Sequence, residues 1–140
     1  MSQRVKPELL NADAIAGALQ SSYWRVSVVD EIDSTQNYLR TSNPKSGDVI
    51  TAEYQSAGRG RLDRKFDAEK SSALLFSLYL EPEVKVESLG YLTLLVGASV
   101  TSTINEITKT ENFKCKWPND ILINEKKISG LIAEIVDDGV

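Results

Sequence analysis

The pattern of hydrophobic and polar residues along this chain predicts strands in some segments. In others, apolar residues at helical spacing predict helices. A segment rich in valine and aromatic residues, Tyr23–Ile32, predicts a strand, and a second predicted strand runs from Asp48 to about Gln55. Two further strands are predicted over Ala73–Leu80 and Phe113–Trp117.

Apolar residues at helical spacing predict three helices. A short helix is expected over Ala12–Leu19, and Ser34 or Thr35 can cap a second helix that runs through Leu39. The longest predicted helix, Val86–Ile107, is expected to lie in the core because its apolar residues recur at helical spacing. These positions are Leu89, Leu92, Val96, Val100, Thr103, Ile104 and Ile107.

The C-terminal part of the chain predicts an antiparallel hairpin. Its strands are Ile121–Ile123 and Lys127–Ile135, joined by a turn at Asn124-Glu125. In the strand before them, Cys115 is expected to be a small buried residue. Mixed, largely antiparallel strands covered by helices define an α+β fold, and we expect one domain over residues 1–140 without an internal boundary.

The composition is that of an ordinary domain and excludes several kinds of chemistry. The 140 residues are 41% hydrophobic and 26% charged, which is sufficient for a core. With no histidine and a single cysteine, the chain excludes Ser-His-Asp and Cys-His nucleophiles, His-liganded metals and CxxC motifs. A net charge of -4 argues against non-specific binding to nucleic acid or membranes. The lone cysteine and a polar N-terminus predict a cytoplasmic protein.

Two segments stand out against this acidic background. The first, Gly58–Lys65, places four cations on a loop in which two glycines let backbone and guanidinium groups close around an anion. In the second, Lys116-Trp117-Pro118-Asn119-Asp120, the proline stops regular pairing and fixes the lysine at a strand end. Together the two segments predict a site for a carboxylate and phosphates, where catalysis depends on positioning and electrostatic stabilisation.

Each segment also has a structural interpretation. The arginine-rich loop alone is typical of a solvated surface loop, although a loop of this length in a compact domain is commonly functional or disordered. A nucleic-acid contact is less favoured, since no aromatic residues are interleaved with the cations. Lys116 alone is compatible with a strand lysine that faces water, and Ser34-Thr35 with a helix cap.

Five short segments occur in a fixed order after residue 30. They are Asp33-Ser34-Thr35-Gln36-Asn37, Gln55-Ser56-Ala57-Gly58-Arg59-Gly60-Arg61, Leu75-Phe76-Ser77-Leu78, Lys116-Trp117-Pro118-Asn119-Asp120-Ile121 and Lys127-Ile128-Ser129-Gly130-Leu131-Ile132-Ala133-Glu134. Taken jointly, they resemble the biotin protein ligase family, whose members attach biotin to carboxylases. The resemblance implies a catalytic domain of the class II aminoacyl-tRNA synthetase and biotin ligase type.

The resemblance implies a reaction in two steps. Biotin and Mg-ATP give biotinyl-5'-AMP and pyrophosphate, and biotin then passes to a lysine of a biotin carboxyl carrier protein of acetyl-CoA carboxylase or a related carboxylase. Biotin, ATP and Mg2+ are therefore the implied ligands, with no protein-held metal site, no DNA or membrane partner, and a homodimer left open. Two alternatives are a non-catalytic biotin-binding fragment and a related lipoate-type acyl ligase, against which a polar pocket favours biotin.

The same resemblance implies roles for individual residues. Lys116 and Arg61 are the implied catalytic residues. The implied biotin-binding residues are Ser34, Thr35, Gln36, Gln55, Gly58, Arg59, Gly60, Arg61 and Lys116. The implied nucleotide-binding residues are Arg61, Arg64, Phe66, Asn119 and Lys127.

The chain departs from the family pattern in two places. Leu62-Asp63-Arg64 replaces a glycine-containing continuation of the loop, and Phe66 takes the place of a tryptophan, so loop closure and packing on the ATP side are expected to differ. The sequence also stops at Val140, before a Gly-x-Gly-x-Asn-type strand, and we expect it to be the first part of a catalytic domain without a DNA-binding winged helix.

Overall fold

The computed structural model describes residues 8–62, 64–136 and 139–140. They fall into two compact units. The N-terminal unit comprises the described residues up to Glu81 together with Val136 and Gly139, and the C-terminal unit comprises Pro82–Ile135 with Val140.

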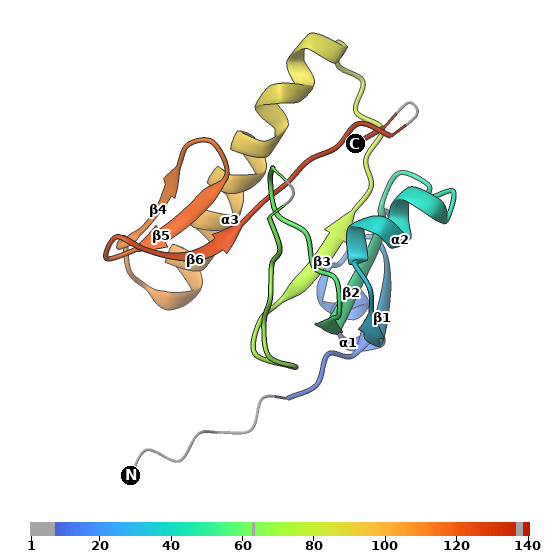
Figure 1. Cartoon of the computed structure of the whole chain (residues 1–140), viewed down its shortest axis with the longest axis horizontal. Coiled ribbons are helices and arrows are strands. Elements are labelled where there is room, and N and C mark those ends of the chain that lie inside the picture. The colour runs from blue at the N-terminus through green and yellow to red at the C-terminus, as the bar shows by residue number, and fades with distance from the viewer. Residues whose placement is uncertain (1–7, 63, 137–138) are drawn as a thin grey trace. The chain divides into compact units, whose positions relative to one another are not determined.

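The N-terminal unit is built on a three-stranded sheet, shown in Figure 1. Its strands are β1 (Arg25–Ile32), β2 (Asp48–Gln55) and β3 (Leu75–Leu78), in the order β1-β2-β3. Strands β1 and β2 are parallel, with Ile32 opposite Gln55, whereas β2 and β3 are antiparallel. Because parallel strands end at the same edge of a sheet, the segments that follow β1 and β2 leave it side by side.

Two short helices belong to this unit. Helix α1 (Ala12–Ala18) begins at Asn11, whose side chain accepts a hydrogen bond from Ala14 N at 2.9 Å. Helix α2 (Thr35–Thr41) joins the parallel strands β1 and β2. The cap predicted at Ser34 or Thr35 is confirmed at Ser34.

The core of the N-terminal unit lies beside β2. Leu39 from α2, Ile50 from β2 and Tyr79 form its buried centre, and Val29 and Val136 pack against them. Four consecutive residues of β2, Ile50–Glu53, are buried. A strand buried over consecutive residues is covered on both faces, so β2 is the central strand.

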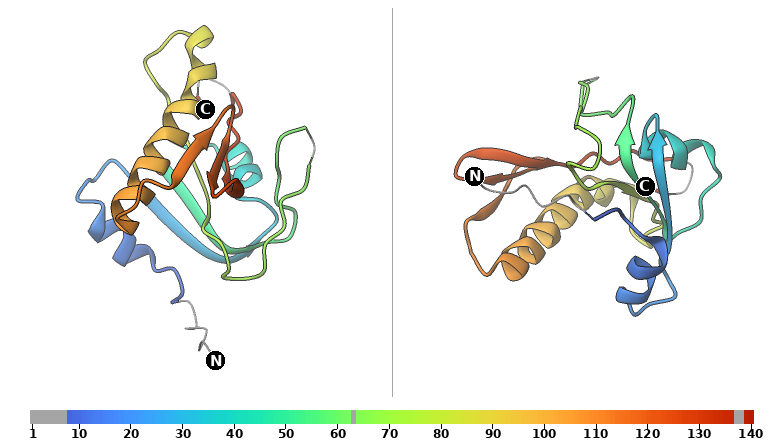
Figure 2. Two further views of the ribbon diagram at one scale, coloured as in Figure 1. Left: turned by 90° about the vertical axis from the view of Figure 1, so that its left-hand side faces the viewer. Right: turned by 90° about the horizontal axis from the view of Figure 1, so that it is seen from below.

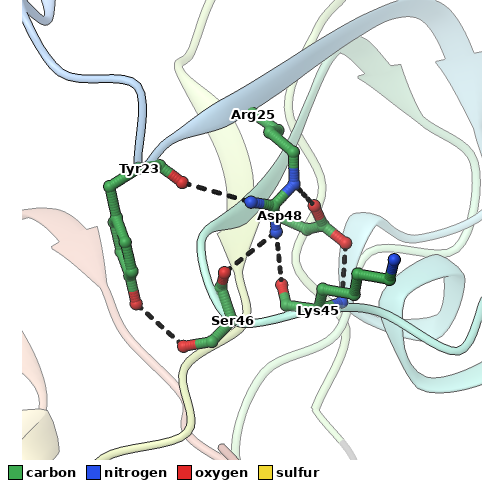
Figure 3. A network of polar contacts seen from close by, with 5 residues as sticks. All are labelled: Tyr23, Arg25, Lys45, Ser46 and Asp48. Carbon is green, nitrogen blue, oxygen red and sulfur yellow. Dashed lines mark hydrogen bonds and ion pairs between the residues drawn. The ribbon is translucent and has the colours of Figure 1, made fainter.

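A polar network joins the N-terminal ends of β1 and β2, as Figure 3 shows. Arg25 Nε donates to Asp48 Oδ1 at 2.6 Å, and Arg25 Nη2 donates to the carbonyl oxygens of Lys45 at 3.1 Å and Ser46 at 2.9 Å. Burial alone would raise the pKa of Asp48, but the hydrogen bond from Lys45 N and the contact with Arg25 lower it below its ordinary value. The network lies at one edge of the sheet, and α2 follows β1 at the opposite edge.

The C-terminal unit contains a helical segment and a three-stranded antiparallel sheet. The 3₁₀-helix η1 (Val86–Tyr91) leads into α3 (Leu92–Thr108). The strands β4 (Phe113–Lys116), β5 (Asp120–Ile123) and β6 (Lys126–Gly130) pair in chain order. In Figure 2, α3 runs beside this sheet.

Helix α3 contacts the sheet mainly through its middle. Gly97 and Thr101 are its buried residues, and a Cβ at Gly97 would lie 3.0 Å from Cys115 Sγ. At its end, Asn105 Oδ1 accepts from Phe113 N and Asn105 Nδ2 donates to Phe113 O, both at 3.1 Å. The helix therefore contacts β4 through the close approach at Gly97 and through the hydrogen bonds of Asn105.

The sequence placed most elements correctly and misjudged some bounds. The strand over Asp48–Gln55 is confirmed residue for residue, and the hairpin turn at Asn124-Glu125 has both residues at positive φ, 48° and 62°. The predicted strand Lys127–Ile135 ends at Gly130, because the hydrogen bonds of Leu131 go to Asn119 in the turn rather than along β5.

Three predictions in the C-terminal unit were wrong. The helix expected from Val86 begins as a 3₁₀-helix and becomes α-helical at Leu92. Ile107 is 75% exposed because the last turn of α3 contacts β4 through Asn105, and Thr103 is also exposed. Cys115 is exposed rather than buried, although its Sγ lies close to the helix at Gly97. Among the residues described, no helix is long and apolar enough to cross a membrane.

Candidate functional site

A cluster of neutral polar side chains lies where β1 and β2 end. The Oε1 atom of Gln55 accepts two hydrogen bonds from Thr35, from N at 2.8 Å and from Oγ1 at 2.9 Å. Thr35 Oγ1 also contacts Ser77 Oγ on β3 at 2.8 Å. We call Ser34, Thr35, Gln55 and Ser77 the polar cluster; it combines the end of β2 and the start of α2 with Ser77, which lies within β3 opposite Ile50.

The polar cluster is held away from solvent. Ser34 is 1% exposed and Thr35 is 3% exposed, while Gln36 and Gln55 are half-buried. Ser34 Oγ accepts from Asn37 N at 3.4 Å as the helix cap, and Asp33 Oδ1 accepts from Ser34 N at 2.6 Å. The cap role of Ser34 is thus confirmed, and a role in binding a ligand stays a prediction.

The arginine-rich segment after β2 forms a narrow hairpin, and Figure 2 shows this part of the chain leaving the sheet as an extended loop. Phe66 N donates to Gly58 O at 2.9 Å, and Gly60 N donates to Arg64 O at 2.7 Å. Arg59 and Lys65 form an isolated antiparallel bridge. We call Gly58–Phe66 the Arg loop; it has backbone pairing that the sequence did not predict.

Gly58 is the glycine on which this hairpin depends. A Cβ added there would lie 2.2 Å from the carbonyl oxygen of Phe66 and 3.1 Å from Gln55 Nε2. At Gly60 the nearest atom, Arg64 O, would be 3.3 Å away. Gly58 is also buried, so its lack of a side chain lets the Arg loop lie against the polar cluster.

The cations of the Arg loop differ in their surroundings. Arg59 is half-buried, and its Nη1 donates to Asn37 Oδ1 on α2 at 3.2 Å. Arg61 and Arg64 are exposed. Further along the chain, Lys70 pairs with Asp30 on β1 at 2.5 Å, and this hydrogen bond raises the pKa of Lys70.

In the C-terminal unit, the predicted cation Lys116 is the last residue of β4, where the sequence placed it. It is exposed and lies opposite Asp120 in the register of β4 and β5. The next peptide bond, between Trp117 and Pro118, is cis, and the chain turns there into β5. The expected end of strand pairing at the proline is confirmed.

The other two predicted residues of this unit make structural contacts. Lys127 Nζ lies 2.8 Å from Asp120 Oδ1, a buried oxygen that accepts no hydrogen bond of good geometry, so the ammonium group is its charge partner. Asn119 Nδ2 donates to Leu131 O at 2.9 Å, and Leu131 N donates to Asn119 O at the same distance. Asn119 therefore shapes the turn that follows Lys116.

The structure thus gathers the predicted residues into two groups. The polar cluster, Gln36 and the Arg loop belong to the N-terminal unit; Lys116, Asn119 and Lys127 belong to the C-terminal unit. Sequence reasoning assigned no role to Ser77, Asn37 or Asp120. All three are in the short motifs, but their partners Thr35, Arg59 and Lys127 became visible only through the fold.

The elements and their pairing define a fold of the α+β class. A family model for the biotin/lipoate A/B protein ligase family matches residues 28–139. The chain belongs to this family. Its α+β fold is that of biotin protein ligases, which is related to the class II aminoacyl-tRNA synthetase fold.

Similar proteins come from several organisms. The chain is 35% identical to the bifunctional ligase/repressor BirA of Escherichia coli over 130 residues, which is 91% of this chain and 40% of that protein. It is 31% identical to the biotin–[acetyl-CoA-carboxylase] ligase of Mycobacterium tuberculosis, covering 88% of this chain and 48% of that protein. A biotin protein ligase from Aquifex aeolicus solved with biotin and ATP matches with a TM-score of 0.74 and 39% identity, over 81% of this chain and 48% of that one.

These matches leave two expectations untested. The chain spans about two fifths to one half of the length of these relatives, so the similarity does not show that it has their whole activity. The relative from Escherichia coli is named a ligase and repressor, so the expectation that this chain binds no DNA stays a prediction.

Proposed function

We propose that this chain provides the biotin-binding part of a biotin protein ligase, which activates biotin with ATP and transfers it to a lysine of a biotin carboxyl carrier protein. The observation that carries the proposal is the buried polar cluster, in which Thr35 and Gln55 are hydrogen-bonded beside the Arg loop. The solved relative from Aquifex aeolicus holds biotin and ATP, which supports the same ligands here.

Biotin fits a pocket of this chemistry because its ureido head is both a donor and an acceptor of hydrogen bonds. Hydroxyl and carboxamide groups at Ser34, Thr35, Gln36 and Gln55 can satisfy such a head, and a site built on buried polar partners rejects analogues that lack them. Lipoate, whose dithiolane ring is apolar, leaves these groups unpaired. The family includes both kinds of ligase, and the polar cluster favours biotin.

In the first step, an oxygen of the biotin carboxylate attacks the α-phosphorus of ATP. The bond between the α-phosphorus and the bridging oxygen breaks, and pyrophosphate leaves with its charge partly balanced by the Mg2+ that enters as Mg-ATP. Both reacting groups are anionic, so cations must offset their repulsion. We assign this role to Lys116 and Arg61, with Arg59 and the backbone at Gly58 and Gly60 closing over the acid.

The remaining candidate residues are assigned to the nucleotide. Arg64 can bind phosphate oxygens, and Phe66 can stack on the adenine or its ribose in place of a tryptophan. Asn119 and Lys127 are assigned to the phosphates and the acyl-adenylate. In the second step, the carrier lysine attacks the acyl carbon, AMP leaves, and an amide forms; we expect the reaction to take place in the cytoplasm.

Transfer of radiolabelled biotin tests the proposal. The chain, supplied with the rest of a ligase catalytic domain in trans, is incubated with Mg-ATP and an apo carrier domain, with radiolabelled lipoate as a parallel substrate. We expect label in biotinyl-5'-AMP and then on the carrier from biotin alone. Binding of biotin without any ATP-dependent product would favour the non-catalytic alternative, and preferential transfer of lipoate would identify a lipoate-type ligase.

A further inference from the structure

The carboxamide of Asn37 lies between a cation and a carboxylate. Its Oδ1 accepts from Arg59 Nη1 at 3.2 Å, and its Nδ2 lies 3.4 Å from Asp33 Oδ2. A guanidinium group only donates hydrogen bonds and a carboxylate only accepts them. These partners therefore determine which way the amide is turned, with its oxygen toward Arg59.

Arg59 is held at its backbone as well as at its guanidinium group. On one side of it, Phe66 N donates to Gly58 O, and on the other Gly60 N donates to Arg64 O. The segment just before the loop is fixed too, since Ala57 N donates to Asp33 O at 2.8 Å. An arginine has many rotamers, and holding both of its ends removes much of the entropy that a ligand would otherwise have to overcome.

The hydrogen bond to Asn37 brings this cation to the helix that carries Thr35. Asn37 lies two residues after Thr35 on α2, and Thr35 is bound directly to Gln55. Arg59 is also half-buried, in contrast to the exposed Arg61 and Arg64. Arg59 is thus set beside the polar cluster through a side chain of α2.

We propose that Asn37 is a positioning residue that holds the Arg59 guanidinium beside the polar cluster, where it meets the carboxylate of the acid to be activated. The inference rests on the proposed function, because it takes biotin as the ligand. Asn37 itself does not touch the reacting atoms. It acts by keeping a cation in place before the anion arrives, so its effect depends on the charge of the ligand.

Paired ligands that differ in charge test this role. Calorimetric titrations compare biotin with biotinamide, a neutral analogue that retains the ureido head, on the parent chain and on Asn37→Ala, Arg59→Ala and the double variant. We expect Asn37→Ala to weaken biotin about tenfold and to leave biotinamide nearly unchanged, since a hydrogen bond to a charged group is being removed. The double variant should bind biotin no more weakly than Arg59→Ala alone.

A matched control and a measurement without ligand complete the test. Thr41→Ala, on the same helix, removes a hydroxyl that donates to the backbone carbonyls of Asn37 and Tyr38, and should change neither affinity. In NMR spectra without ligand, the Arg59 Nε–H signal, identified by its loss in Arg59→Ala, should shift in Asn37→Ala.

The possible failures are distinguishable. A parent chain that binds no biotin would contradict the proposed function, while an unmoved Arg59 signal would by itself overturn the positioning role. Equal losses for biotin and biotinamide, or additive losses in the double variant, would also overturn that role and leave the proposed function standing.

Discussion

The two groups of candidate residues differ in how the chain holds them. In the N-terminal unit, Thr35 is 3% exposed and its hydroxyl is hydrogen-bonded to both Gln55 and Ser77. In the C-terminal unit, Lys116 is exposed at the end of a four-residue strand, and 49% of the Lys127 side chain is exposed. Neutral polar groups can be buried when they are hydrogen-bonded, whereas an unpaired ammonium group is much more costly to bury.

This difference suits the two groups to different tasks: recognition of a polar ligand and stabilisation of charge on a reacting anion. Groups that recognise a polar ligand can be built into the fold and kept rigid, but they then also contribute to its stability. Cations that act on a reacting anion can stay near solvent until the ligand excludes water. We therefore expect substitutions in the polar cluster to change stability and binding together, and substitution of the exposed Lys116 to change the reaction alone.

The largest effect is expected at Lys116. Lys116→Ala should slow adenylate formation by roughly 10²–10³-fold, the scale for one electrostatic group at a reacting centre. The free energy of unfolding should stay within about 0.5 kcal/mol of the parent, since the side chain is exposed. Biotin-dependent exchange between pyrophosphate and ATP measures the rate, and Lys114→Ala on the same strand is the control. Adenylation within about threefold of the parent would show that Lys116 is not the central cation.

Thr35→Val should affect both properties. The change removes the Thr35 hydroxyl from the half-buried Gln55 and Ser77 side chains, which costs about 1–3 kcal/mol of stability, although Gln55 keeps its bond from Thr35 N. Biotin affinity should fall by about tenfold or more, because the cluster that recognises the ureido head is disordered. Urea unfolding and calorimetric titration measure the two effects, and Thr35→Ser, which keeps the hydroxyl, is the control. Loss of affinity with unchanged stability would contradict the expected coupling.

The glycines of the Arg loop provide a finer test. Gly58→Ala introduces a Cβ that would sit 2.2 Å from the Phe66 carbonyl, so the hairpin must shift and stability should fall by about 1–3 kcal/mol. Gly60→Ala meets its nearest atom at 3.3 Å and should cost less. Thermal unfolding and the rate of proteolysis in the loop measure both variants. Equal effects at the two positions would argue against close packing at Gly58.

The smallest effect is expected at the opposite edge of the sheet, where charge serves stability alone. The pKa of Asp48 is lowered in the folded chain, so its contribution is present above its ordinary value of 3.8 and is lost as pH falls through the folded pKa. The Arg25–Asp48 pair is partly exposed, so the contribution is at most about 1 kcal/mol. Unfolding of the parent and of Asp48→Asn should differ at pH 7 and converge near pH 2. A constant difference over this range would mean that the carboxylate charge is not involved.

Much of the fold could be predicted because the patterns formed by neighbouring residues in the sequence agreed with the burial of those residues in the structure. The strand at Asp48–Gln55, the helix cap at Ser34 and the turn at Asn124-Glu125 each depend on residues that are neighbours in the chain. Predictions failed where burial is decided by distant segments. Ile107 has the spacing of a core residue but lies where the helix end contacts β4 through Asn105, and Cys115 is exposed although its Sγ lies close to α3 at Gly97.

The sequence by itself determined the kind of chemistry available: no histidine, one cysteine, an arginine-rich segment with two glycines, and a lysine before a proline. It also determined the order of motifs by which the family can be recognised. Only the tertiary structure decided which of these residues meet. Thr35 lies 20 residues from Gln55 and 42 from Ser77 in the chain, and Asn37 lies 22 from Arg59. The parallel register of β1 and β2 ends both strands at one edge and so brings Thr35 to Gln55, while the antiparallel pairing of β3 with β2 brings Ser77 to the same helix; no local spacing along the chain encodes either register.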